Sequence, residues 1–143
     1  MSHDAVLQLY FNHPTTLEKI VTTLFDAGWS LNDYGKISLY VESGHDEYDW
    51  VDMKLVEEKD FFTTLKREAK NTKLVGIVLS WKFQEEGISL LMHDPKVLIV
   101  GMRINRRKLE NSIFSDVTWY LDRVLTPLAQ TLKIESFSWS DHV

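Results

Sequence analysis

The chain has 143 residues, no cysteine and a formal net charge of −5. A chain of this length is typical of one domain and buries roughly 70% of the surface that it exposes when unfolded. Without cysteine it can form no disulfide, thiolate metal site or cysteine nucleophile. The first ten residues lack the apolar core of a signal peptide, and the run Val97–Met102 is far shorter than the roughly 20 residues that cross a bilayer. We therefore expect a single cytoplasmic domain over residues 1–143 that does not enter a membrane.

The negative charge is concentrated between residues 42 and 60. This segment holds eight acidic and two basic residues, so its net charge is −6 and the rest of the chain carries +1. A field of this sign repels phosphate backbones and attracts basic surfaces. We therefore expect a basic protein partner rather than nucleic acid.

The first two predicted elements are a strand and a helix. Residues 5–11 are apolar and rich in β-forming types, which predicts a strand. Thr15 and Glu18 have the spacing of a capping box, Gly28 is a typical stop, and a helix is predicted over residues 16–26. Its apolar face has helical spacing and comprises Leu17, Ile20, Val21, Leu24 and Phe25.

A hairpin and a second helix follow. Apolar and polar residues alternate over residues 36–42 and again over 48–56, which predicts two paired strands with a turn between them. Trp50 falls on the same strand parity as Asp52, which we expect to point outward. Acids at the start and bases at the end favour a helix over residues 57–70.

The remaining chain predicts a meander, a long helix and a closing strand. Short turns separate β-rich runs at residues 73–83, 88–93 and 97–104. An apolar stripe that includes Ile113 predicts a helix over about 110–133, kinked or split by Pro127. A last strand is expected at residues 134–139.

The predicted order is therefore β-α-β-β-α-β-β-β-α-β. This order indicates an α+β fold with a mostly antiparallel sheet and helices packed on one face, and its first six elements are compatible with a ferredoxin-like unit.

Patterns that carry catalysis are missing. The sequence has no Walker-type loop, GxGxxG run or HExxH helix. His93, followed by Asp94 at a predicted strand end, is the one general-base candidate, and no activated nucleophile accompanies it. We expect a protein that is not an enzyme and uses no cofactor.

The acids near residue 46 invite a metal-site interpretation, because hard cations take several oxygen ligands. The stretch from Asp46 lacks the glycine that an EF-hand loop needs at its sixth position, and no histidines have zinc spacing. A solvated acidic face or a protein-binding patch is favoured over a metal site. A basic cluster, for which a solvated turn is favoured over an anion or nucleic-acid site, comprises Arg103, Arg106, Arg107 and Lys108.

Five tryptophans are many for a chain of this size. Trp81 and Trp119 fit the apolar faces of a strand and a helix, so core packing is expected for them. Trp50 flanks the acidic turn, and an exposed tryptophan among carboxylates has the composition of an interface hot spot. The predicted partner-binding residues are Glu42, Asp46, Glu47, Asp49, Trp50 and Asp52.

The segment Phe114-Ser-Asp-Val-Thr-Trp-Tyr-Leu121, with Leu125–Leu128 and Ile134–Trp139, resembles small bacterial immunity proteins of polymorphic toxin systems. The resemblance implies a cytoplasmic protein that binds the catalytic domain of a cognate toxin and blocks it, and it implies no particular site residue. A localised acidic surface that mimics phosphate would suit such a partner. Two alternatives stay open: a regulatory domain that binds a small molecule or protein through its sheet face, and a small hydrolase or transferase that uses His93 and a neighbouring carboxylate.

Overall fold

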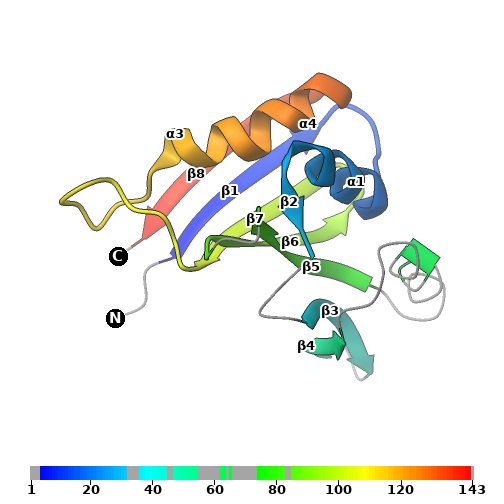
Figure 1. Cartoon of the computed structure of the whole chain (residues 1–143). Coiled ribbons are helices and arrows are strands. Elements are labelled where there is room, and N and C mark those ends of the chain that lie inside the picture. The colour runs from blue at the N-terminus through cyan, green and yellow to red at the C-terminus, as the bar shows by residue number, and fades with distance from the viewer. Residues whose placement is uncertain are drawn as a thin grey trace.

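A computed structural model describes residues 4–31, 36–44, 47–54, 62–63, 65, 74–82 and 85–142. It has an α+β fold in which an antiparallel sheet carries helices on one face (Figure 1). The strands are β1 (Asp4–Phe11), β2 (Trp29–Ser30), β3 (Lys36–Gly44), β4 (Glu47–Lys54), β5 (Leu74–Trp81), β6 (Gly87–Asp94), β7 (Val97–Ile104) and β8 (Ile134–His142). The helical segments are α1 (Leu17–Ala27), α3 (Val117–Tyr120), the π-helical turn η1 (Leu121–Leu125) and α4 (Thr126–Thr131).

The sheet has the strand order β4-β3-β5-β6-β7-β1-β8, and the short β2 pairs with β5 beside this path. Every pairing between these strands is antiparallel. β4 and β8 therefore form the two ends of the described sheet. The β3–β4 hairpin and the last strand lie far apart in the molecule (Figure 1).

The predicted order of elements needs correction. β2 was not expected, because two residues are too few to produce a periodic pattern. Most of the helix predicted over residues 57–70 lies outside the described residues. Within that range the structure describes Phe62, Thr63 and Leu65, and all three are helical. A ferredoxin-like unit in the first half is not shown, because β1 pairs with β7 and β8, which both come from the second half of the chain.

The core lies between the sheet and the helices. Leu7, Val100 and Leu90 are opposite one another on three neighbouring strands, and all three are fully buried. Ile20 and Leu24 of α1 are equally buried, which confirms the predicted apolar face of this helix. Each such side chain contributes roughly 1.5–3 kcal/mol by leaving water.

The start of α1 differs by one residue from the prediction. Thr16, and not Thr15, is the N-cap, and its hydroxyl accepts a hydrogen bond from the Lys19 N–H at 3.2 Å. Gly28 ends the helix at φ 121°, a conformation that a residue with a side chain rarely adopts, so the predicted stop is confirmed.

The last helix begins later than its apolar pattern predicts. Asp116 is its N-cap and accepts a hydrogen bond from the Trp119 N–H at 3.3 Å, so residues 110–116 form a loop. Ile113, which was assigned to the apolar stripe of the helix, lies exposed in this loop. The helix then widens into η1, which ends two residues before Pro127, and the missing N–H of this proline interrupts the α-helical hydrogen bonds there.

None of the helices in the described part of the chain has both the length and the apolar composition of a membrane span.

Candidate functional site

The acidic hairpin consists of β3 and β4, at one end of the sheet. The structure places Glu42 on β3 and Glu47, Asp49, Trp50 and Asp52 on β4, while Asp46 lies outside the described residues. The backbone register sets Trp50 opposite Tyr40 and Glu42 opposite Tyr48. Five of the six predicted partner-binding residues are thus brought together on two neighbouring strands.

The register also divides these residues between the two faces of the hairpin. Successive positions of a strand alternate between faces, so the positions of Trp50 and Asp52 share one face and that of Asp49 belongs to the other. A partner that covers a single face of this hairpin would meet only part of the predicted set. A partner that approaches the outer edge of β4 would meet both parts.

A second surface is formed by the loop between β7 and α3, residues 105–116, which we call the β7–α3 loop. It projects from the body of the molecule (yellow in Figure 1). Its tip is a turn in which the Ser112 N–H donates to the Leu109 carbonyl at 3.2 Å. The Leu109 N–H donates to the Phe114 carbonyl at 3.0 Å, and Lys108 pairs with Ser115 as an isolated bridge. The loop is therefore closed by its own main chain.

Arg106 stabilises the β7–α3 loop by hydrogen bonds to residues of the same loop. Its guanidinium donates to the Ile113 carbonyl at 2.8 Å and to the Ser115 hydroxyl at 3.0 Å. The Ser115 hydroxyl in turn donates to a carboxylate oxygen of Asp141 at 2.7 Å, which joins the base of the loop to the end of β8.

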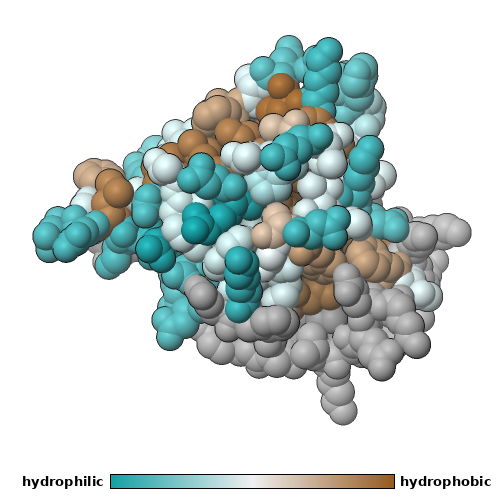
Figure 2. Space-filling model, turned by 45° about the horizontal axis from the view of Figure 1, so that its top comes forward, coloured by the Kyte–Doolittle hydropathy of each residue, from teal (hydrophilic) through white to brown (hydrophobic). Residues whose placement is uncertain are grey.

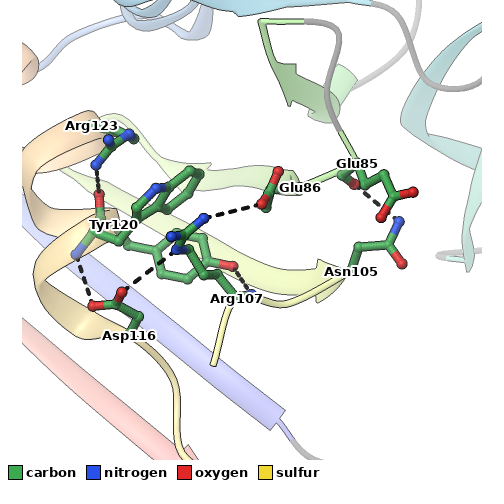
Figure 3. A network of polar contacts seen from close by, with 8 residues as sticks. Glu85, Glu86, Asn105, Arg107, Asp116, Tyr120 and Arg123 are labelled. Atoms are coloured by element: carbon green, nitrogen blue, oxygen red, sulfur yellow. Dashed lines mark hydrogen bonds and ion pairs between the residues drawn. The ribbon is translucent and has the colours of Figure 1, made fainter. Parts of the chain in front are cut away.

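Arg107 connects the loop to the sheet and to the last helix (Figure 3). Its guanidinium lies 3.5 Å from Glu86 and 3.6 Å from Asp116, and its central carbon is 5.3 Å from the centre of the Trp119 ring. Its main-chain N–H donates to the Tyr120 hydroxyl at 2.8 Å. Arg106 and Arg107 lie in a loop in which Arg107 and Lys108 are exposed, as predicted, and both arginines also hold other residues in place, which the sequence did not predict.

Tyr120 has a phenol group whose pKa is displaced. Burial raises the pKa of its phenol above the ordinary value, and the hydrogen bond from Arg107 offsets part of that rise. The hydroxyl therefore stays protonated at neutral pH and accepts the Arg107 N–H while buried beneath the loop.

Three of the five tryptophans, Trp29, Trp81 and Trp119, pack as a cluster around Arg123 of η1. The guanidinium carbon lies 4.5 Å from the centre of the Trp119 ring and 5.2 Å from that of Trp81. The Arg123 carbonyl accepts the indole N–H of Trp29 at 2.8 Å. Core packing of Trp119 is confirmed, whereas Trp81 is half-buried at the rim of the core. The side chain of Trp50 lies outside the described set.

Sequence reasoning missed the exposed apolar side chains of the β7–α3 loop. Leu109, Ile113 and Phe114 are 49%, 54% and 48% exposed. Figure 2 shows brown, hydrophobic atoms gathered on this projecting loop. Asn111 has φ 58°, which is typical of a turn. The sequence contains a turn signal here, because Asn and Ser lie between apolar residues, but the helical spacing of Ile113 favours a helix instead.

The fourth large exposed hydrophobic side chain of the described residues is Phe137 of β8, at 46%. It lies opposite Leu9 of β1, which is fully buried. β8 pairs with β1 alone among the described strands, so its other edge presents main-chain N–H and C=O groups.

The predicted general base, His93, lies at the end of β6. His93 is exposed near the β6–β7 turn, and the carboxylate of Asp94 accepts the Lys96 N–H at 2.8 Å. Within the described ranges no three histidine, aspartate or glutamate residues gather as metal ligands would.

The sheet face opposite the helices is partly apolar. Gln8, Ile99 and Leu91 occupy adjacent positions on β1, β7 and β6, and all three are half-buried. Val6 and Tyr10 flank them on β1 with the same exposure.

Comparisons with known proteins add no family. No family model matches the chain, and neither the curated proteins nor the solved structures contain a match.

Proposed function

We propose that the chain is a non-enzymatic, cytoplasmic binding protein, and specifically an immunity protein that binds and inhibits a cognate bacterial toxin domain. The observation that carries the proposal is the position of the acidic residues: Glu47, Asp49 and Asp52 lie on β4, at the end of the sheet, with Glu42 on the neighbouring strand. An edge strand that carries several acids and few bases suits a basic protein surface.

The chemistry of such a partner follows from the charge. A toxin that acts on nucleic acid needs a basic active site to hold phosphates, and an acidic edge that enters it would replace those phosphates. Long-range attraction would also speed the encounter, which is an advantage for an inhibitor that must act before the toxin does. No cofactor or metal is needed for this activity.

The resemblance of residues 114–121 to immunity proteins supports the same class by a separate route. These residues begin at the projecting loop and continue into α3, where Asp116 caps the helix and Trp119 packs against Arg107. The apolar, preorganised loop is a further feature that suits a protein-binding domain, because ordering it on binding would cost little entropy.

The test is co-expression with the toxin encoded beside this chain. The intact chain should restore growth, and a variant with Asp49→Lys and Asp52→Lys should not, although it accumulates and melts like the parent. Lys108→Glu is the matched control, because Lys108 is exposed on the distant β7–α3 loop and its reversal should leave protection unchanged. Protection by the Asp49 and Asp52 variant, or the lack of any adjacent toxin gene, would contradict the proposal.

A second candidate is a regulatory domain that binds a small molecule or another protein through the sheet face of Gln8, Leu91 and Ile99. The half-buried apolar positions on the face opposite the helices favour it. Under this alternative, Ile99→Lys should abolish binding while the reversals on β4 have no effect.

A further inference from the structure

The outer edge of β8 has a pattern that is complementary to itself. Residues 136–140 read Ser-Phe-Ser-Trp-Ser, so the chemistry is nearly the same in both directions around Ser138. The whole of β8 contains no lysine, arginine or proline, the residues that usually protect an edge strand from pairing. These five residues also pair with β1 in unbroken register, from Ser136 opposite Tyr10 to Ser140 opposite Val6. The segment is therefore regular enough to pair with another strand on its other edge.

We propose that β8 pairs with β8 of a second copy of this chain, antiparallel and centred on Ser138. This inference does not depend on the proposed function, because β8 and the acidic hairpin lie at opposite ends of the sheet. The register sets Phe137 of each copy opposite Trp139 of the other, and Ser136 opposite Ser140. Aromatic pairs and serine pairs directly opposite each other are among the favourable cross-strand combinations.

The exposure of Phe137 and the packing of Trp139 agree with a second copy of the chain as the partner of β8. Phe137 is 46% exposed, although the residue beside it on β1, Leu9, is fully buried, so Phe137 has one covered side and one open side. Trp139 is held in position, since its indole N–H donates to Asp141 at 2.9 Å and its ring lies 5.7 Å from that of Tyr120. A second copy would cover the open side of Phe137 with a preordered aromatic ring, twice in one symmetric interface.

The ends of the paired segment are also defined. The register with β1 shifts between Tyr10 and Phe11, where β8 contains one extra residue at Glu135. The bulge takes Glu135 out of the regular pairing, whereas at the other end the register with β1 continues through Asp141 to His142 and only the self-complementary pattern stops. Because both flanking residues are acidic and would approach each other across the interface, salt should strengthen the dimer slightly by screening them.

A single-cysteine experiment tests the register, and the absence of cysteine from the chain gives it a clean background. In Ser138→Cys the two thiols would face each other across the twofold axis, so mild oxidation with diamide should link most of the protein into a covalent dimer. Ser136→Cys is the matched control: Ser136 is also exposed and on the same strand, but it faces Ser140 of the other copy and should link at least about tenfold more slowly.

Sedimentation equilibrium of the unmodified chain tests the association itself. We expect a reversible dimer, and Phe137→Lys should weaken it by at least about 30-fold, the effect of losing a hot-spot side chain. Circular dichroism should show that the variant keeps its fold, since the position is half exposed; if Phe137→Lys does not fold, Ser138→Lys serves the same purpose. A monomer at all concentrations, a dimer that Phe137→Lys leaves intact, or equal crosslinking at positions 136 and 138 would each overturn the proposal.

Discussion

The two ends of the described sheet differ in chemistry. β4 carries Glu47, Asp49 and Asp52 within eight residues, whereas β8 carries a central run of serines and aromatic residues. Like charges directly opposite each other oppose pairing between copies of the same chain, while the stretch 136–140 of β8, between Glu135 and Asp141, is uncharged and self-complementary. Under the two proposals above, the acids distributed along β4 suit a basic surface, and the uncharged centre of β8 suits a second copy.

The largest effect on stability is expected when the buried neighbour of β8 on β1 is truncated, and a much smaller one when the exposed residue of β8 itself is truncated. Leu9 and Phe137 are neighbours on adjacent strands, one fully buried and the other 46% exposed. Leu9→Ala should lower the free energy of unfolding by about 2–5 kcal/mol, because it leaves a cavity in the core. Phe137→Ala should lower it by less than about 1 kcal/mol in dilute solution, where the chain is monomeric. Equal losses in urea melts would show that Phe137 belongs to the core and not to an interface.

The Tyr120 hydroxyl connects the β7–α3 loop to the core beside β8 by a hydrogen bond. Removing this hydroxyl should destabilise the loop without affecting the other end of the sheet. Tyr120→Phe leaves the Arg107 N–H without its acceptor and should cost about 1–3 kcal/mol in urea melts. Hydrogen exchange should then increase in residues 105–116 and remain unchanged in β4. An equal increase at both ends would contradict the local role of this hydrogen bond.

The same residue makes a prediction for alkaline pH. Burial raises the pKa of Tyr120 in the folded chain above its value in the unfolded chain, so ionisation favours the unfolded state. Its effect on stability is absent below pH of about 10, the ordinary tyrosine value, and grows as the pH rises toward the folded pKa. The stability of the parent should therefore fall more steeply above pH 10 than that of Tyr120→Phe, as measured by urea melts across this range.

A smaller effect is expected from charge reversal on β4. With a basic partner, Asp49→Lys together with Asp52→Lys should slow association about tenfold at low salt, and the difference should shrink as salt is added. The β8 dimer should respond to salt in the opposite direction. Lys108→Glu is a better control than reversal of Arg106 or Arg107, because these two arginines hold the loop. Stopped-flow mixing at several salt concentrations measures these rates.

The smallest effect is the one expected from chelation. The chain should melt at the same temperature with and without EDTA, because the spacing of its histidines and acids supplies no recognisable metal site. A clear drop in the melting temperature that one divalent ion reverses would indicate that the residues from Asp46 to Asp52 bind a metal rather than a protein partner.

Local patterns predicted most of the elements but not their arrangement. The α1 helix and the strands of the second half follow directly from apolar spacing, because each pattern reports which face is buried. The strand order depends on pairings between distant residues, such as β1 with β8, and no local pattern specifies them. The apolar loop was missed for a related reason: Ile113 has the spacing of a buried residue, and only the cap at Asp116 shows that the helix has not yet begun.

The acidic hairpin was predicted as a pair of strands, and the structure shows that pairing. The sequence did not predict that β4 would end the sheet or that its acids would divide between two faces. The first property depends on which strand lies beside β3, which is β5, whereas the division between faces follows from the alternation of positions along β4. The candidate site could therefore be predicted as a set of residues but not as a surface.

Hydrogen exchange at increasing protein concentration tests the difference between the two edges most directly, because it needs neither a variant nor a known partner. If β8 pairs with a second copy, exchange of the main-chain amides within residues 136–140 should slow as the concentration rises, while exchange of the β4 amides stays constant. Concentration-independent exchange in β8, or protection that rises in β4 instead, would contradict the account.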